Sequence, residues 1–162
     1  MEYHNIEPLY DRKSRILLLG SFPSVKSREA QFFYHHPQNR FWKVLAAVTE
    51  SPAPVTIEEK KKLLLSRHIA LWDVIASCDI EGSSDSSIKN VVPNDIGRLF
   101  KETEIEYLFT NGQTAHKYYQ KYIKNTICRE DIVLPSTSPA NAAWSLERLI
   151  AAWGKTLPCV WK

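Results

Sequence analysis

The strongest constraint on the fold is a short apolar run near the N-terminus, Ile16-Leu17-Leu18-Leu19, which follows Arg15 and ends at Gly20. The run is continuous rather than alternating, so a strand made of these residues would be buried on both faces. Strands of this kind occur almost only in α/β proteins, in which helices cover both faces of a parallel sheet. The run therefore predicts a central parallel strand over residues 15–20.

Helical and strand patterns alternate along the rest of the chain. The patterns predict further strands at 69–75, 105–110 and 131–134 and helices at 40–49, 56–67, 93–102, 113–124 and 142–153, with a long polar loop at 78–90 and a short extended tail at 158–161. Thr56 to Glu59 has the form of a capping box, and Asn141 can cap the last helix. This alternation predicts an α/β fold with three layers, α/β/α, around a central, mainly parallel four-stranded sheet. At this length, residues 1–162 are expected to form a single domain.

Two polar segments follow strands of this predicted sheet. Gly20-Ser21-Phe22-Pro23-Ser24 comes directly after the first strand and leads to a second polar stretch at 35–42, and Leu134 to Ala142 comes after the last strand. Ligands of open α/β sheets bind at the carboxyl ends of the strands. The sequence therefore predicts that both segments meet at one cleft.

Composition narrows the function classes only modestly. The net charge of +3 permits nucleic-acid binding but fits an enzyme with a small substrate equally well. No apolar stretch is long enough to cross a bilayer and no secretory signal is present, so a cytoplasmic location is expected. The three cysteines are widely spaced, as in ordinary reduced thiols. Dinucleotide, P-loop and nucleophile-elbow motifs are absent, and His35-His36 lacks partners at ligand spacing, so no metal is expected.

The two segments resemble the uracil-DNA glycosylase superfamily, most closely its hypoxanthine-DNA (deoxyinosine) glycosylase branch. The matching motifs are Gly20-Ser21-Phe22-Pro23-Ser24, the stretch His35-His36-Pro37-Gln38-Asn39-Arg40-Phe41-Trp42, and Leu134 to Ala142, joined by Leu71-Trp72-Asp73, Gly82 to Ser86 and Thr110-Asn111-Gly112. The portion from His36 to Trp42 is also similar to the mismatch-specific uracil and thymine glycosylases. The resemblance covers nearly the whole chain, in order.

This resemblance implies a monofunctional DNA glycosylase of base excision repair. Such an enzyme flips a deoxyinosine out of the duplex and hydrolyses the N-glycosidic bond, which releases hypoxanthine and leaves an abasic site. The partner is DNA containing a deaminated base, no metal or other cofactor is needed, and a monomer is expected. Three alternatives stay open: a uracil or thymine mismatch glycosylase, a non-catalytic nucleic-acid-binding module on the same fold, and a hydrolase of a small nucleoside or ester.

One departure from the superfamily moves the expected catalytic residue. The residue before Pro23 is Asp or Asn in most of the superfamily, where it activates or holds water, but here it is Phe22. In the hypoxanthine branch the essential polar residue lies further on, and this position corresponds to Asn39. We expect the Asn39 side chain to position the water or contact the base. The alternative is a turn residue that caps the helix beginning near Phe41.

The resemblance also implies the remaining site residues. The expected base-binding residues are Ser21, Phe22, Tyr34, Asp73 and Asn111, with Tyr34 stacking on the base and Asp73 accepting from N1–H of hypoxanthine. The expected DNA-binding residues are His36, Ser136, Thr137, Ser138 and Asn141; the three hydroxyl residues suit phosphate, and Asn141 would enter the gap left by the flipped nucleotide. Structural roles remain the alternative for Asp73, His36 and the loop at 136–138. Lys26, Arg28 and Arg40 would hold phosphates or be solvated.

Overall fold

The computed structural model describes residues 1–161 and confirms the predicted α/β architecture. Four parallel strands pair in the order β3-β2-β6-β7. Their bounds are Ile16–Gly20 for β2, Ile69–Asp73 for β3, Tyr107–Asn111 for β6 and Ile132–Leu134 for β7. Every residue of β2 and β3 is buried, as the continuous apolar run predicted for β2.

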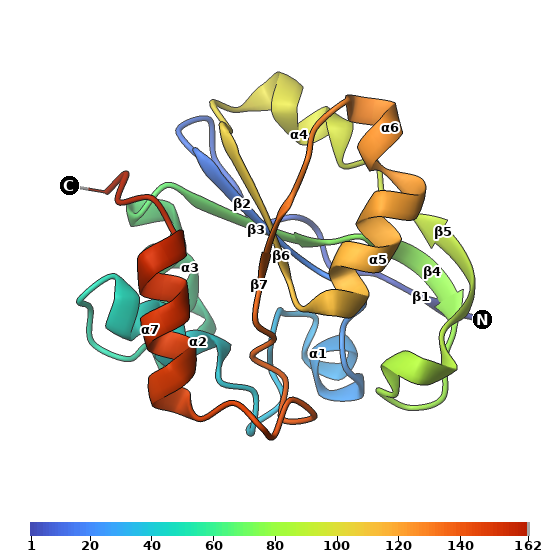
Figure 1. Cartoon of the computed structure of the whole chain (residues 1–162), viewed down its shortest axis with the longest axis horizontal. Coiled ribbons are helices and arrows are strands. Elements are labelled where there is room, and N and C mark those ends of the chain that lie inside the picture. Colours follow the sequence, from blue (N-terminus) through green and yellow to red (C-terminus); the bar gives the residue numbers. More distant parts are fainter. Residues whose placement is uncertain (162) are drawn as a thin grey trace.

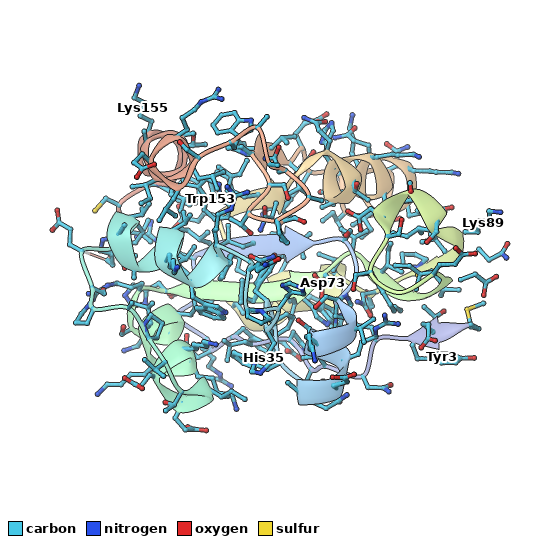
Figure 2. The ribbon with its side chains drawn as sticks, turned by 90° about the horizontal axis from the view of Figure 1, so that it is seen from below. Tyr3, His35, Asp73, Lys89, Trp153 and Lys155 are labelled. Carbon is cyan, nitrogen blue, oxygen red and sulfur yellow. The ribbon has the colours of Figure 1, made fainter. Side chains whose placement is uncertain are left out.

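Helices cover both faces of this sheet (Figure 1). Helices α2 (Phe41–Val48), α3 (Ile57–Ser66) and α7 (Leu146–Thr156) lie on one side, and α4 (Gly97–Glu102), α5 (Gln113–Tyr122) and α6 (Lys124–Ile127) lie on the other. Helix α7 directs Trp153 into the core and leaves Lys155 at the surface (Figure 2). The helices fall on two faces because the chain passes from β2 to β3 on one side of β2 and then crosses back to β6 on its other side, and crossovers between parallel strands are right-handed.

The chain adds β3 on one side of β2 and β6 on the other, and this reversal of strand order creates a crevice beside β2. Connections after β2 and β6 leave toward opposite faces, so a gap opens outside the carboxyl ends of these two strands. The short helix α1 (Val25–Ala30) follows β2 at this edge. The fold thus provides the cleft that the two polar segments predicted.

A second, antiparallel sheet of three strands was not predicted. It pairs β1 (Glu2–Tyr3), β4 (Ile75–Asp79) and β5 (Lys89–Pro93) in the order β1-β4-β5. The strand expected at 69–75 is present as β3 but ends earlier, at Asp73. Val74, whose N–H still donates to Gly20 O at 2.8 Å, separates it from β4, which begins at Ile75 and joins the second sheet. The loop expected at 78–90 is shorter, with a 3₁₀ turn (Asp85–Ser87) between β4 and β5.

Several helix boundaries also differ from the sequence prediction. The capping box of Thr56 and Glu59 is present. The last helix does not begin at Ala142 behind Asn141; Ser145 caps it instead, accepting from the N–H of Arg148 at 3.2 Å. Pro93 ends β5 rather than opening a helix. Residues 160–161 form a turn and not an extended tail. Within residues 1–161, no helix combines the length and apolarity needed to span a bilayer.

Candidate active site

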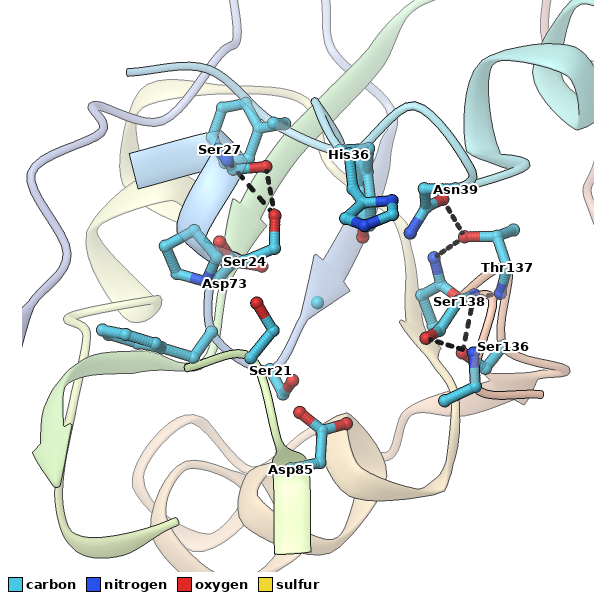
Figure 3. A pocket seen from close by; sticks show the side chains of 18 of the residues that line it. Ser21, Ser24, Ser27, His36, Asn39, Asp73, Asp85, Ser136, Thr137 and Ser138 are labelled. Atoms are coloured by element: carbon cyan, nitrogen blue, oxygen red, sulfur yellow. Dashed lines mark hydrogen bonds between the residues drawn. The ribbon is translucent and has the colours of Figure 1, made fainter. Parts of the chain in front are cut away.

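A cavity of about 260 Å³ lies at the carboxyl edge of the central sheet (Figure 3). Its walls include every expected site residue except Asn141. These are Ser21, Phe22, Tyr34, His36, Asn39, Asp73, Asn111, Ser136, Thr137 and Ser138. The volume approaches the roughly 300–1,000 Å³ typical of small-molecule pockets. Both polar segments therefore do meet at one cavity.

The floor of the cavity is formed where β2 and β3 end side by side. Gly20 pairs with Asp73 in the parallel register. A Cβ atom on Gly20 would lie 2.3 Å from Asp73 Oδ1 and 2.9 Å from the Tyr34 hydroxyl oxygen. Glycine at this position therefore makes room for both polar groups above the strand end.

The N-terminal segment supplies a partner for Asp73 that the sequence did not reveal. His4 Nε2 lies 2.7 Å from Asp73 Oδ2, and both side chains are almost fully buried. The N–H of Ile6 donates to His4 Nδ1 at 3.3 Å, so the ring proton sits on Nε2 and is donated to the carboxylate. Oδ2 of Asp73 is thereby occupied, while Oδ1 makes no hydrogen bond within residues 1–161. Only the pairing of β1 with β4 brings His4 to this place, and no local motif signals it.

A chain of hydrogen bonds ties the two polar segments together. Asn111 Nδ2 donates to Thr137 Oγ1 at 3.0 Å, and this hydroxyl donates to Asn39 Oδ1 at 2.9 Å. Asn39 Oδ1 also accepts from the N–H of Phe41 at 2.9 Å. Because a backbone N–H can only donate, the orientation of the Asn39 amide is fixed. Thr137, expected at the DNA, is instead a fully buried connection between the two asparagines.

The structure therefore combines both interpretations of Asn39. Its carbonyl oxygen accepts from the N–H of Phe41, the first residue of α2, and from the Thr137 hydroxyl, although the N-cap position of α2 is Arg40. Its Nδ2 group makes no hydrogen bond within the described residues and turns toward the cavity (Figure 3). The group available to a substrate is thus a double donor and not the acceptor needed to hold water.

Arg40 is not available to a DNA phosphate. Its guanidinium donates to two carbonyl oxygens of the second polar segment, Ser138 O at 2.9 Å and Asn141 O at 3.1 Å, and to Trp144 O just beyond it. Arg28 is also engaged, with Gly82 O at 2.6 Å and with Glu2 at 3.3 Å. The expectation that these two arginines flank the site as free cations is therefore wrong.

The loop at 136–138 satisfies many of its own polar groups. The N–H of Thr137 donates to Asn111 Oδ1 at 3.1 Å, and the N–H of Ser138 donates to Ser136 Oγ at 3.1 Å. Asn141 donates to Ser136 O at 2.9 Å and stays outside the cavity wall. These backbone donors and the Asn141 amide brace the loop, which leaves the hydroxyl side chains of Ser136 and Ser138 facing the cavity.

Aromatic residues form the side of the cavity. The Tyr34 ring stacks on Phe41, with 4.0 Å between the ring centroids and 14° between the planes, so one face of Tyr34 is already covered. Phe22 is buried, with its ring 6.2 Å from that of His4. His36 Nδ1 accepts from the N–H of Gln38 at 3.1 Å, so its Nε2–H is the group available at the cavity wall.

Asp85 is a cavity residue that the sequence reasoning missed, although its segment was part of the resemblance. It stands at the solvent-exposed mouth, and its carboxylate points toward Ser21 (Figure 3). Partial desolvation at the cavity mouth raises the pKa of Asp85, and the negative charge of Asp73 adds to the rise, while hydrogen bonds with the Thr114 and Ser21 hydroxyls oppose it. A carboxylate with a raised pKa in a cavity is a typical acid–base group.

Similarity to known proteins is extensive. A family model for the uracil DNA glycosylase superfamily matches residues 7–156. A protein of Methanosarcina acetivorans named hypoxanthine DNA glycosylase is 35% identical over 140 residues, which cover 85% of this chain and 87% of the relative. A protein of the same name from Methanosarcina barkeri is 28% identical over 157 residues, covering 96% and 98%.

A solved structure agrees with these relatives. The solution NMR structure of a candidate uracil DNA glycosylase from Methanosarcina acetivorans superposes with a TM-score of 0.80 at 31% identity, covering 93% of each chain. Its likeness extends over the layers that position the cavity. Sequence, fold and the placement of the site motifs lead to one assignment: the chain belongs to the uracil DNA glycosylase superfamily.

Proposed function

We propose that this protein is a monofunctional DNA glycosylase that removes hypoxanthine from deoxyinosine in DNA and leaves an abasic site. Two relatives named hypoxanthine DNA glycosylase support the substrate. The observation that carries the proposal is the buried Asp73 carboxylate, which has one oxygen held by His4 and the other free at the cavity floor. In this proposal residues 1–162 form a single domain that acts as a monomer, because one chain completes the cavity.

A free carboxylate oxygen at the floor selects among bases. Hypoxanthine carries an N1–H donor beside its O6 acceptor, whereas adenine presents a bare N1 acceptor at the same place. Adenine at this position would set its N1 lone pair against the Asp73 oxygen and leave both groups unpaired, which strongly disfavours binding. The duplex also helps, since a deoxyinosine mispair is weaker than a normal pair and its nucleotide flips out at lower cost.

The bond to be broken is the one between C1′ of deoxyribose and N9 of hypoxanthine. Water adds at C1′, the electron pair of the bond leaves with the base, and the transition state has oxocarbenium character at the sugar. The water must lose a proton, and Phe22 cannot accept it. We assign this role to Asp85, whose carboxylate stands at the mouth of the cavity. This hydrolysis needs neither a metal nor a redox cofactor.

The donors of the cavity suit the other half of the reaction. Negative charge develops on the departing base, and hydrogen-bond donors fixed in advance stabilise such charge. The Asn39 amide is fixed in advance by two hydrogen bonds to its carbonyl oxygen. We therefore assign Asn39 to donation toward the substrate, rather than to the positioning of water.

The test is an excision panel on duplex DNA. Duplexes carrying deoxyinosine, uracil, xanthine or a G·T mismatch are treated with the protein and then with alkali, which cleaves at abasic sites. Deoxyinosine should be the preferred substrate. If none of these duplexes yields abasic sites, the protein is not a glycosylase of this class. If uracil is excised faster than hypoxanthine, the substrate is uracil and not hypoxanthine.

Two substitutions at Asn39 separate its roles. Asn39→Asp keeps the acceptor for Phe41 and Thr137 but removes the amide donors, so it should remain folded and lose most excision. Asn39→Ala removes both and should lose stability as well. Asn125→Ala, at an exposed position on α6, is the matched control and should behave like the wild type. If Asn39→Asp excises hypoxanthine as fast as the wild type, the Asn39 amide is not a catalytic donor, whereas the proposed glycosylase function still stands.

A further inference from the structure

The cavity floor contains a second polar group that the proposed reaction does not yet use, the hydroxyl of Tyr34. Its oxygen is buried and has no hydrogen-bond partner among residues 1–161. Burial raises the pKa of Tyr34 and the nearby Asp73 carboxylate adds to the rise, while the Asn111 side chain opposes it. The hydroxyl therefore keeps its proton at neutral pH and is an unused donor.

The Tyr34 hydroxyl and Asp73 Oδ1 converge on one place. Both lie within 2.9 Å of the Cβ position that Gly20 leaves vacant. They are therefore close enough to meet neighbouring atoms on the edge of one planar base. One is a donor and the other is an acceptor, and this order is complementary to a base edge that carries C=O next to N–H.

The surroundings hold both groups in place. The Tyr34 ring is stacked on Phe41, and its backbone has φ of 49°, a conformation that a bulky residue adopts only where its surroundings impose it. The Asp73 carboxylate is fixed by the His4 Nε2–H at 2.7 Å. Because His4 already donates to Oδ2, Oδ1 remains the oxygen that faces the cavity.

We propose that the Tyr34 hydroxyl and the Asp73 carboxylate, held by His4, form a donor–acceptor pair that reads the C6=O and N1–H edge of the flipped base. Tyr34 donates to O6, Asp73 accepts from N1–H, and His4 is a positioning residue that acts through Asp73. The inference rests on the proposed glycosylase function and deepens it. It gives Tyr34 a polar role in place of the stacking expected from its ring, because the phenolic hydroxyl lies in the plane of the ring and meets the edge of a base, not its face.

This pair defines a substrate class. Hydrolytic deamination converts an amino group next to a ring nitrogen into a C=O next to N–H, so hypoxanthine, xanthine and uracil all present the matching edge. Adenine and cytosine present the reverse order and leave both protein groups unpaired, which disfavours them strongly. The pair therefore separates hypoxanthine from adenine and uracil from cytosine. Guanine presents the same C6=O and N1–H edge as hypoxanthine and xanthine, so it must be excluded at its 2-amino group. Size and the other edges of the cavity must also separate the deaminated bases from one another.

The decisive experiment replaces one atom of the base and deletes one oxygen atom from the protein. The substrates are duplexes with deoxyinosine or with 6-thio-deoxyinosine, in which the strong acceptor O6 becomes a weak sulfur acceptor while N1–H stays. The proteins are the wild type, Tyr34→Phe, and the control Tyr119→Phe. The hydroxyl of Tyr119 donates to Arg129 O at 2.6 Å, and Tyr119 does not line the cavity. Single-turnover rates give an oxo-to-thio ratio for each protein.

We expect the wild type and Tyr119→Phe to excise hypoxanthine about 10- to 100-fold faster than its thio analogue, the range of one lost buried hydrogen bond. Tyr34→Phe should excise hypoxanthine slower by a similar factor, and its oxo-to-thio ratio should approach one. The ratio is taken within a single protein, so a partial folding defect cancels. An unchanged ratio in Tyr34→Phe would overturn the inference. Absence of hypoxanthine excision by the wild type would instead overturn the proposed function.

The role of His4 is tested through a second ratio. Unsubstituted purine lacks both O6 and N1–H, so the ratio of hypoxanthine to purine excision measures reading of the edge. His4→Phe removes the donor to Asp73 and should lower this ratio about 10-fold or more, whereas His4→Gln retains an N–H near the Nε2 position and should preserve much of it. Equal ratios in both variants and the wild type would show that His4 does not position Asp73 for reading the base.

Discussion

Gly20→Ala is the most informative single substitution, because it adds one methyl group directly beneath the base-reading pair. Gly20 does not need its conformational freedom here, since its φ lies outside the left-handed region. The added Cβ would lie 2.3 Å from Asp73 Oδ1 and 2.9 Å from the Tyr34 hydroxyl. The substitution therefore tests the space above the strand end, not the backbone.

The expected effect follows from these distances. A carbon–oxygen contact is normally about 3.3 Å or longer, so Asp73 Oδ1 must retreat by about 1 Å. The retreat is opposed by the 2.7 Å hydrogen bond from His4 to the other oxygen. A displacement of about 1 Å at a substrate contact can lower the rate about 100-fold. Overpacking of a buried site typically costs about 1–3 kcal/mol, and each kcal/mol lowers Tm by about 2–4 °C in a chain of this size.

The assay is single-turnover release of hypoxanthine from a deoxyinosine duplex, together with a thermal unfolding curve. Gly154→Ala is the control. Gly154 lies in α7, and its added Cβ would meet Val48 of α2 at an ordinary distance of 4.0 Å. It should leave excision unchanged and stabilise the helix by up to about 1 kcal/mol. If Gly20→Ala excises hypoxanthine within a few-fold of the wild type, neither Asp73 nor Tyr34 contacts the base as argued.

Of three further predictions, two concern cavity residues, Thr137 and Asp85, and the third concerns Asp131, outside the cavity. Thr137→Val removes the shared hydroxyl at nearly constant shape, so urea unfolding should show a loss of about 1–3 kcal/mol and excision should slow; an unchanged midpoint would refute the bracing role. Asp85→Asn should slow excision and remove the loss of activity that protonation of this carboxylate causes at acid pH; undiminished activity would dismiss Asp85 as the base. Burial acts to raise the pKa of Asp131, but hydrogen bonds from Thr110, His116 and Gln120 outweigh it and lower the pKa. This stabilisation is complete above the unfolded pKa of about 3.9 and is lost as the pH falls through the lower folded value. The free energy of unfolding, measured with urea at a series of acid pH values, should therefore fall less steeply with pH in Asp131→Asn than in the wild type.

The sequence predicted what local patterns can determine. A continuous apolar run identified β2, and alternation of strands and helices identified the layers, because burial on two faces leaves a pattern in the residues themselves. The small antiparallel sheet leaves no comparable pattern: the chain bends at Val74 between two apolar stretches that read as one, and β5 is largely exposed. Its existence depends on pairing between distant segments.

The same distinction applies to the site. Asn39 was found from its motif, but its orientation depends on Thr137, which is 98 residues away. Arg40 looked like a free cation because nothing nearby in the sequence shows that the carbonyl oxygens of Ser138 and Asn141 will surround it. Contacts between distant segments determine whether a polar residue faces the substrate or the protein, and motifs do not record them.

The position of His4 has a practical consequence. This residue reaches Asp73 only because the two residues of β1 pair with β4 and because the N–H of His4 donates to Ala76 O at 2.7 Å. Deletion of residues 1–3, or a tag that disturbs their pairing with β4, would leave the four-stranded sheet intact while loosening the floor of the cavity. Substrate preferences measured on N-terminally tagged protein would then be broader than those of the untagged chain, so comparisons of selectivity between relatives call for tags at the opposite end.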